Sequence, residues 1–363
     1  MKSKEIIFYA PLGKGIPASR CGGAEAGCHK TLDIYRNADF HVFILNKPAK
    51  AQGIIKYLGG MLIAPFLLIK QLLLHPQAPV HLVGFYRDIV IHEFLLMQIC
   101  RLFNHKVIYE PRNGSLVTSY QTRGYIYRNI LKSLLVKPDV VLCQGLEYVD
   151  FIKTKWGISR TYYPNFIKDD FIKSNNINRD RQPIKLIYFG RVTPAKKVEI
   201  VIEATALLKR EGQNVVLDIV GGYDESYYKL LYGIAKNHEI CDIITFHGRQ
   251  DFAFIAKNLQ NAHYFIFPSQ ETQEGHSNSL TEAMGCGVVP IVSNAGFNAS
   301  ICGNPELVVK GMDAHLYADK IMEIETNHKW SRYSEAVYNR VMQNYTEKVV
   351  GERLASTIEQ LYE

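Results

Sequence analysis

The feature that most constrains the fold of this chain is a repeated alternation between short apolar runs and longer segments with helical spacing. The runs are rich in β-branched and aromatic residues and form two series: EIIFYA, HVFIL, VHLVGF, KVIYE and DVVLC, then IKLIYFG, VVLDIVGG, IITFHG, HYFIFP and VVPIVS. Strands that are apolar on both faces indicate parallel sheets covered by helices. Two such series predict an α/β protein with two doubly wound, Rossmann-like domains facing a central cleft, where ligands bind at strand carboxyl ends.

The boundaries of these domains are set by one polar stretch. With 363 residues the chain is long for a single core, which favours two domains. Residues 169–183 are rich in Asn and charge and end at Pro183, so we expect a linker there. We therefore predict a first domain over 1–168, a second over 184–335, and a C-terminal helical segment, 336–363, that packs across the domain junction.

Charge is distributed unevenly between the two halves. Residues 1–165 contain 21 Lys and Arg against 10 Asp and Glu, whereas the whole chain carries a net charge of only +7. A basic half suggests an anionic partner, such as nucleic acid, a membrane surface or a phosphorylated substrate. A basic surface without a partner is the alternative.

Residues 54–74 are unusually hydrophobic. Their apolar or glycine positions are unbroken only over 57–69, which is 13 residues and short of the ~20 that a spanning helix needs. On a helix the polar and glycine positions fall within roughly 120° of one another; these positions are Lys56, Gly59, Gly60, Lys70 and Gln71. The segment suits a helix lying in a membrane interface and, equally well, a core helix.

A second stretch, 111–138, contains no Asp or Glu and interleaves basic residues with tyrosines, among them Arg123, Arg128 and Lys132. This pattern suits an anionic lipid surface. A solvated helix face is the alternative.

Two glutamates follow the run HYFIFP in the second half. Glu274 lies in a polar loop, and Glu282 lies just inside a helix that we expect to start near Ser279. Exposed N–H groups at a helix start suit a diphosphate, and the Glu282 carboxylate can accept hydrogen bonds from two ribose hydroxyls. The alternative is a capping box, in which Ser279 and Glu282 satisfy each other's backbone N–H groups.

A pair of cations follows the run IKLIYFG in the same way. Gly190 permits close backbone approach after the strand, and Arg191 and Lys196 come next in GRVTPAKK. Cations held in place stabilise the charge that develops on a leaving diphosphate. The alternative is surface charge around a turn containing Pro194.

Together these motifs resemble the retaining glycosyltransferases of family four, the glycosyl transferases group 1, which have the GT-B fold; the resemblance is to the bacterial surface-polysaccharide type. It is carried by GRVTPAK and by EGHSNSLTE followed by AMGCGVVPIVS, and it extends to RCGGAE (20–25), YYPNF (162–166), IVGGYDE (219–225) and FHGRQ (246–250).

The resemblance implies a role for each matching residue. Arg191 and Lys196 would bind the donor diphosphate, Glu282 the ribose, and Glu274 the donor sugar near its reacting carbon, with Glu271 as a competitor for that last role. The further donor-binding positions would be Gly22, Gly23, Gly190, Gly222, Gly248, Arg249, Gly275, Asn278, Ser279 and Leu280. Lys197 departs from the family pattern, because relatives commonly have glycine there.

For the acceptor, the resemblance points to YEPRNGSL (109–116) and so to Arg112 and Asn113. It also implies transfer with retention of configuration and without a metal or cofactor. In agreement, no two Asp residues are spaced D-x-D, and the seven cysteines show no C-x-x-C pattern and are predicted to be reduced thiols.

We therefore expect a cytoplasmic enzyme, peripheral on the inner face of the plasma membrane. It would move a sugar from a nucleotide-sugar donor to a polyprenyl-diphosphate-linked glycan during O-antigen or capsule synthesis. A sugar-nucleotide epimerase of the same architecture is one alternative. A non-catalytic protein that binds anionic lipid or nucleic acid is another alternative. The sequence contains no nucleic-acid-binding motif, so we expect no nucleic-acid partner.

Overall fold

The computed structural model describes all residues except 1–3, 16–22, 170, 172–178, 271–273 and 363. It comprises two compact units. The first is Met1–Asn165 together with Val350–Glu363, and the second is Phe166–Val349. This division differs from the predicted one mainly at the C-terminus, where the last residues return to the first unit.

The first unit contains a six-stranded parallel sheet with the order β2-β1-β3-β4-β5-β6. Its strands are β1 (Lys4–Ala10), β2 (Phe40–Asn46), β3 (Val80–Gly84), β4 (Val107–Pro111), β5 (Val140–Cys143) and β6 (Thr161–Tyr162). Its helices are α1 (Gly23–Asn37), α2 (Ile54–Leu74), α3 (Val90–Leu102), α4 (Leu116–Thr122), α5 (Tyr125–Val136) and α6 (Leu146–Trp156), with most of α14 (Glu347–Glu359). The central strands β3 and β4 are buried along their whole length, as the apolar runs predicted.

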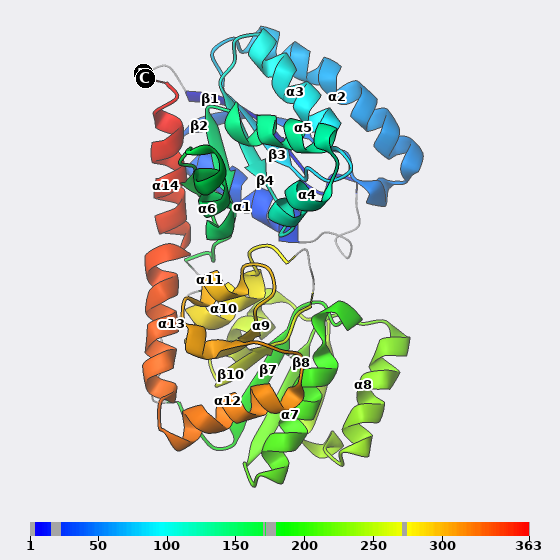
Figure 1. The fold of residues 1–363 in the computed structure, drawn as a ribbon, viewed down its shortest axis with the longest axis vertical. Helices are drawn as coiled ribbons and strands as arrows, with labels where there is room; N and C mark the ends of the chain where they lie inside the picture. Colours follow the sequence, from blue (N-terminus) through cyan, green and yellow to red (C-terminus); the bar gives the residue numbers. More distant parts are fainter. Residues whose placement is uncertain (1–3, 16–22, 170, 172–178, 271–273, 363) are drawn as a thin grey trace. The chain divides into compact units, whose positions relative to one another are not determined.

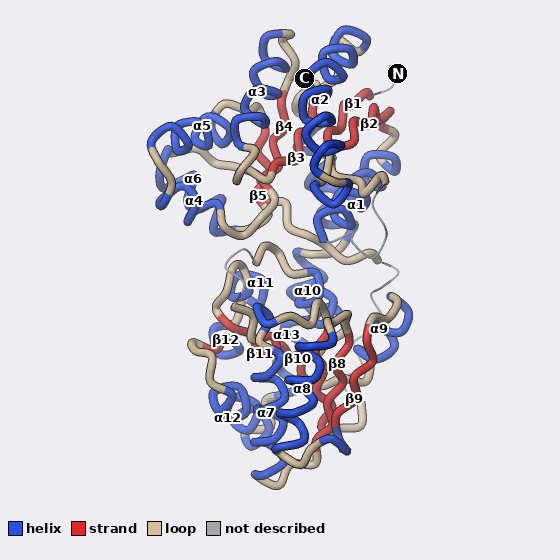
Figure 2. Tube along the Cα trace, turned by 90° about the vertical axis from the view of Figure 1, so that its right-hand side faces the viewer, coloured by secondary structure: helices blue, strands red, loops and turns tan. Residues whose placement is uncertain are grey.

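The second unit repeats the plan with the order β12-β11-β10-β7-β8-β9, again parallel (Figure 2). Its strands are β7 (Ile184–Phe189), β8 (Val215–Val220), β9 (Ile244–Gly248), β10 (Tyr264–Phe267), β11 (Val289–Ser293) and β12 (Val308–Val309). Its helices are α7 (Val198–Arg210), α8 (Glu225–Asn237), α9 (Phe252–Leu259), α10 (Asn278–Gly285), α11 (Asn298–Cys302), α12 (Ala314–Thr326) and α13 (Trp330–Asn344).

These two sheets confirm the predicted α/β class. Each predicted apolar run became a strand, because alternation with helices leaves both faces of every strand covered. The sequence missed only the two-residue edge strands β6 and β12, which are too short to show a pattern.

Helix α2 settles one open question about residues 54–74. Its buried residues are only Tyr57, Ala64, Leu68 and Leu72, all on the side that faces the unit. The core-helix reading is therefore wrong. Among the described residues, this is the one helix whose length and apolar composition match those of a membrane-crossing helix.

Candidate functional site

The candidate site lies at the carboxyl edge of the second sheet. Strand β7 lies near the centre of that sheet. The chain continues outward from it through β8 and β9 on one side, and β10, β11 and β12 lie on the other side. The loops after β7 and β10 therefore flank the point where strand order reverses, which is where ligands bind in open α/β sheets. Both predicted motifs lie in these two loops.

Close packing of the loops after β7, β8 and β9 defines one side of the site. Gly221 donates a hydrogen bond to the carbonyl oxygen of Gly248 at 2.8 Å, and Val192 donates to that of Gly222 at 3.1 Å. A Cβ atom at Gly221 would collide with the carbonyl oxygen of Gly190, so only glycine fits there. The predicted glycines 190, 222 and 248 lie in these joined loops but are themselves not crowded, because a Cβ atom at any of them would meet no atom closer than 3.7 Å.

Lys196 and Glu274 form the charged centre of the site. The Lys196 ammonium makes an ion pair with the Glu274 carboxylate, and both side chains are largely buried. The Ser269 hydroxyl donates to the same carboxylate oxygen at 2.8 Å, and the Phe267 ring centroid lies 5.2 Å from the Lys196 nitrogen. The fold thus brings together a cation and a carboxylate that the sequence assigned to one ligand.

The loop that carries Glu274 is held by its neighbours. Gln270 donates its backbone N–H to the carbonyl oxygen of Ala195 at 2.9 Å, which joins the loops after β10 and β7. Gly296 has φ 54°, and a Cβ atom there would collide with the backbone of Glu274. A cavity of about 520 Å³ opens beside this contact. It is lined by Gln270, Asn294, Ala295, Gly296, Val309, Lys310, Gly311 and Met312.

Helix α10 begins one residue earlier than expected and is capped by a different serine. Ser277 is the N-cap, and its hydroxyl accepts from the N–H of Leu280 at 3.3 Å. The alternative of a capping box between Ser279 and Glu282 is therefore wrong, because Glu282 lies in the second turn, two residues beyond the reciprocal capping position. Glu282 is partly exposed there.

Arg191 and Lys197 show how the backbone shapes the loop after β7. The side chain of Arg191 is exposed, while its carbonyl oxygen accepts from the Tyr188 hydroxyl at 2.7 Å. Lys197 adopts the left-handed conformation, with φ 54° and ψ 45°. That conformation is the physical reason why glycine would suit this position.

A group of aromatic residues, missed from sequence, lies beside the loop after β8. The rings of Tyr223 and Tyr228 stack with their centroids 4.9 Å apart. His247 pairs with Asp218 at 2.6 Å, one residue before Gly248. The tyrosines in GGYDESYYK were the available signal, since half-buried aromatic rings at a strand end suit a nucleotide base. Arg249 is exposed next to this group, and Gly275 is partly exposed.

Three predicted residues need separate mention. Gly22 and Glu271 lie outside the described residues, so the choice between Glu271 and Glu274 stays open. Gly23 is the exposed first residue of α1 in the first unit.

Arg112 is buried in the first unit, with 4% of its surface exposed. Its guanidinium pairs with Glu110 at 2.6 Å, and Glu110 also contacts His81 at 3.1 Å. Burial would raise the pKa of Glu110, but Arg112 and His81 lower it below its ordinary value. Gly27 of α1 leaves the space that Arg112 fills. Arg112 thus has a structural role, and its contact with an acceptor stays a prediction.

Asn113 follows in a loop that is firmly held. Its backbone carbonyl oxygen accepts from the Tyr86 hydroxyl at 2.7 Å, and its side-chain oxygen accepts from Ser115 at 2.7 Å. An acceptor contact by Asn113 also stays a prediction.

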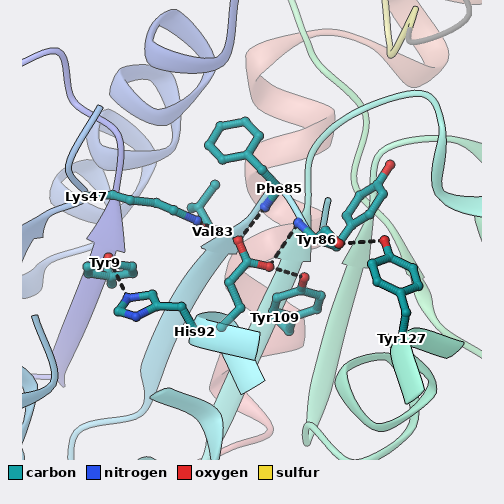
Figure 3. Close-up of polar contacts among 9 residues, drawn as sticks. Tyr9, Lys47, Val83, Phe85, Tyr86, His92, Tyr109 and Tyr127 are labelled. Atoms are coloured by element: carbon teal, nitrogen blue, oxygen red, sulfur yellow. Dashed lines mark hydrogen bonds and ion pairs between the residues drawn. The ribbon is translucent and has the colours of Figure 1, made fainter. Parts of the chain in front are cut away.

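A buried ion pair at the carboxyl edge of the first sheet was not foreseen (Figure 3). Lys47, just after β2, pairs with Glu93 of α3 at 2.7 Å. The same carboxylate accepts from the backbone N–H groups of Phe85 and Tyr86, at 2.6 and 3.0 Å, and from the Tyr109 hydroxyl at 2.8 Å. Glu93 therefore holds the loop after β3. A glutamate within the apolar stretch VIHEFLL was the signal that could have revealed it.

No group of three or more His, Cys, Asp or Glu side chains suited to a metal ion occurs among the described residues.

Comparisons with solved structures identify the fold. The sucrose-phosphate synthase of Thermosynechococcus elongatus aligns with a TM-score of 0.77 over 99% of each chain at 17% identity. HepE of Anabaena in complex with UDP-glucose aligns with a TM-score of 0.70 over 98% of this chain and 99% of HepE, at 14% identity. The fold is therefore GT-B.

Residues 169–340 match the model of the family described as glycosyl transferases group 1. Protein CapJ of Staphylococcus aureus is 26% identical over 228 residues, 61% of this chain. An uncharacterized glycosyltransferase of Methanocaldococcus jannaschii is 27% identical over 278 residues, 68% of this chain. The chain spans 56% of CapJ and 66% of the second relative.

Proposed function

We propose that this protein is a retaining, metal-independent glycosyltransferase of the hexosyltransferase type, which uses a nucleotide-sugar donor. The observation that carries the proposal is the pairing of Lys196 with Glu274 where strand order reverses in a group 1 domain. HepE, which shares the fold, was solved with UDP-glucose, and this supports a donor of the same chemical class.

In the reaction, the bond between the anomeric carbon and the diphosphate oxygen breaks, and a bond to an acceptor oxygen forms. The acceptor proton leaves with the nucleoside diphosphate. Lys196 and Arg191 would stabilise the charge that develops on the departing diphosphate. Glu274, released from Lys196 when the diphosphate binds, would accept hydrogen bonds from the donor sugar.

The start of α10 would bind the phosphates through backbone N–H groups. Asn278 and Ser279 are better placed for this than Leu280, because the Leu280 N–H already donates to Ser277. Glu282 would accept from the ribose hydroxyls, and the Tyr223–Tyr228 group would lie near the base. Gly190, Gly222 and Gly248, which leave open space where a side chain would be, would allow close approach to the ligand.

The acceptor, in this proposal, is a polyprenyl-diphosphate-linked glycan of bacterial surface polysaccharide synthesis. The enzyme would work in the cytoplasm, peripheral on the inner face of the plasma membrane. The excess of basic residues in 1–165, which include Arg123, Arg128 and Lys132, supports a partner with an anionic surface.

A panel of UDP-, GDP- and ADP-sugars tests the proposal, with binding and turnover measured separately. We expect one donor class to bind and to be turned over, in the presence of EDTA as in its absence. If no nucleotide bound, the proposal would fail. Donor sugar epimerised without an acceptor would instead support the epimerase alternative, and loss of activity in EDTA would contradict metal independence.

A further inference from the structure

Helix α2 exposes apolar side chains along its whole outer side. Ile55, Leu62, Phe66 and Leu73 are 84%, 74%, 73% and 65% exposed. They are seven, four and seven residues apart, so at 3.6 residues per turn they lie along one line of the helix. The buried residues of α2 lie on the opposite side. Bulky apolar groups in such a row are not the scattered exposed residues of an ordinary surface.

The neighbouring helix extends this apolar surface. Helix α3 packs beside α2, as Figure 1 shows, and exposes Ile91, Leu95 and Leu102 with spacings of four and seven residues. These three also lie along one side of their helix. We call the exposed apolar residues of the two helices the α2–α3 face.

Helix α2 is attached to the unit along its inner side. Gly60 lies so close to Pro48 that a Cβ atom there would collide with the proline ring. Leu68 and Leu72 are buried, and α2 packs on β2 as well as on α3. A helix held in this way presents one side outward and would lie parallel to a surface that the unit meets through that side.

The charged side chains of α2 itself are basic, and Glu5, near its end, pairs with His75 at 3.3 Å. Helix α2 contains no acidic residue, and its Lys56 and Lys70 are exposed. Asp88, in the loop after β3, lies 3.6 Å from both Lys50 and Arg123 and is thereby neutralised. Exposed apolar groups bordered by cations match the chemistry of an anionic lipid surface.

Aromatic and apolar groups at the start of α5 adjoin the same edge. Tyr125 and Ile126 are exposed there, and Tyr127 donates a hydrogen bond to the carbonyl oxygen of Tyr86 at 2.6 Å. The start of α5 therefore lies beside the loop after β3, near the start of α3. Tyrosine at such a position suits the boundary between lipid headgroups and acyl chains.

We propose that the α2–α3 face inserts into the headgroup and outer acyl region of one leaflet of an anionic membrane, with α2 lying in the plane of that interface. Helix α2 is long and apolar enough to cross a membrane, but its inner side packs on the unit through Leu68 and Leu72, so it could not cross without drawing the unit into the bilayer. Exposure of the outer side excludes a core helix. An interfacial helix is the remaining solution, because it buries the apolar side and leaves the lysines among the headgroups.

This inference rests on the proposed function, since it specifies the surface by which the enzyme would reach a lipid-linked acceptor. Helices that follow parallel strands start at the carboxyl edge of the sheet, and α2 and α3 do so here. In this class of domain, ligands bind at that edge. Membrane and acceptor would therefore meet the first unit at the same edge.

Flotation of the full chain with phosphatidylcholine vesicles, with and without phosphatidylglycerol, tests the proposal. Leu62→Ser combined with Phe66→Ser should lower vesicle partitioning roughly tenfold or more, because two apolar side chains no longer leave water. The matched control replaces Leu230 and Leu316 by serine, two exposed leucines of the second unit, and should bind vesicles as the parent does. Raised salt should weaken parental binding only in part, leaving the apolar contribution.

Three results would overturn the proposal. The first is a parent that ignores anionic vesicles at low salt. The second is an α2 double variant that floats as the parent does. The third is a parent that sediments as a dimer, becomes a monomer in the α2 double variant and binds no vesicles, which would make the face a contact between two copies. A titration with UDP-sugar on the same samples keeps the outcomes distinct, because donor binding should be equal in all variants.

Discussion

The two units share one plan, a six-stranded parallel sheet with helices between the strands and a buried Lys–Glu pair at its carboxyl edge, yet they expose different groups. In the second unit the charged residues Arg191, Lys196 and Glu274 gather at the carboxyl edge. In the first unit Lys47 and Glu93 also form a buried pair, but the outer side of α2 exposes a row of large apolar residues. The comparison teaches that a fold determines where a site lies, while the exposed groups determine what it can bind: as we propose, a diphosphate in one unit and lipid in the other.

The largest expected effect comes from breaking the buried ion pair of the first unit. Lys47→Met leaves the Glu93 carboxylate buried without its cation and should cost about 3–5 kcal/mol of stability. Hydrogen exchange of α3 peptides in urea measures this loss of stability. Peptides of α7 in the second unit serve as an internal control, because the substitution should not change their exchange.

Lys50→Met is the matched control, because Lys50 is an exposed lysine three residues further on. It should change stability by less than about 0.5 kcal/mol. Equal stability of Lys47→Met and the parent would show that the buried pair does not hold the loop after β3.

The next effect concerns the charged centre of the second unit. Lys196→Ala should lower kcat by about two orders of magnitude, equivalent to about 3 kcal/mol, because a preorganised cation no longer stabilises the leaving diphosphate. Steady-state kinetics with the donor found in the panel measure the change. Lys209→Ala, which removes an exposed lysine paired with Asp242, should leave kcat unchanged. Near-parental turnover of Lys196→Ala would place the diphosphate elsewhere.

Acid should distinguish the two units. Burial and the nearby Arg181 and Arg179 lower the pKa of His263, in the second unit, to about 3 from 6.5. Between these two pH values the folded state binds fewer protons than the unfolded state. The free energy of unfolding of the second unit therefore falls by up to about 1.4 kcal/mol for each pH unit of acidification. In the first unit, burial and then Lys47 also lower the pKa of His92, by less than the shift at His263, and the lowered pKa of Glu110 adds a loss only below pH 4.5. The second unit should therefore lose more stability between pH 6.5 and 4.5.

Each unit contains one tryptophan, which makes the acid prediction measurable. Trp330 lies against His263, with ring centroids 5.7 Å apart, and Trp156 lies in the first unit. In an acid titration, fluorescence of Trp330 in Trp156→Phe should change at higher pH than fluorescence of Trp156 in Trp330→Phe. Simultaneous changes, or a first unit that responds earlier, would contradict this.

The smallest effect separates stability from binding at α10. Ser277→Ala should cost about 1 kcal/mol of stability, because the N-cap hydrogen bond is lost. Glu282→Gln should leave stability nearly unchanged while weakening donor binding. Thermal melts beside nucleotide titrations measure both. If Glu282→Gln bound the donor as the parent does, the ribose role would be wrong.

The sequence by itself determined the class of fold and the loops that carry the site. Alternating apolar runs and helical segments have few solutions in which every strand is covered, and motifs next to strand ends must lie at the carboxyl edge. Residues near one another in sequence, such as Arg191 and Lys196, could therefore be assigned to one loop without coordinates.

Only the tertiary structure decided how these residues are used. Lys196 and Glu274 are far apart in sequence, and they pair because β7 and β10 are neighbours in the sheet. Burial also depends on every packed neighbour at once, and a local pattern does not record it. For this reason Arg112 is buried and the outer side of α2 is exposed, although the sequence pattern of each segment was compatible with either environment. Backbone geometry decided that Ser277 caps α10. Both Ser277 and Ser279 have a hydroxyl that could serve, but only Ser277 occupies the last non-helical position.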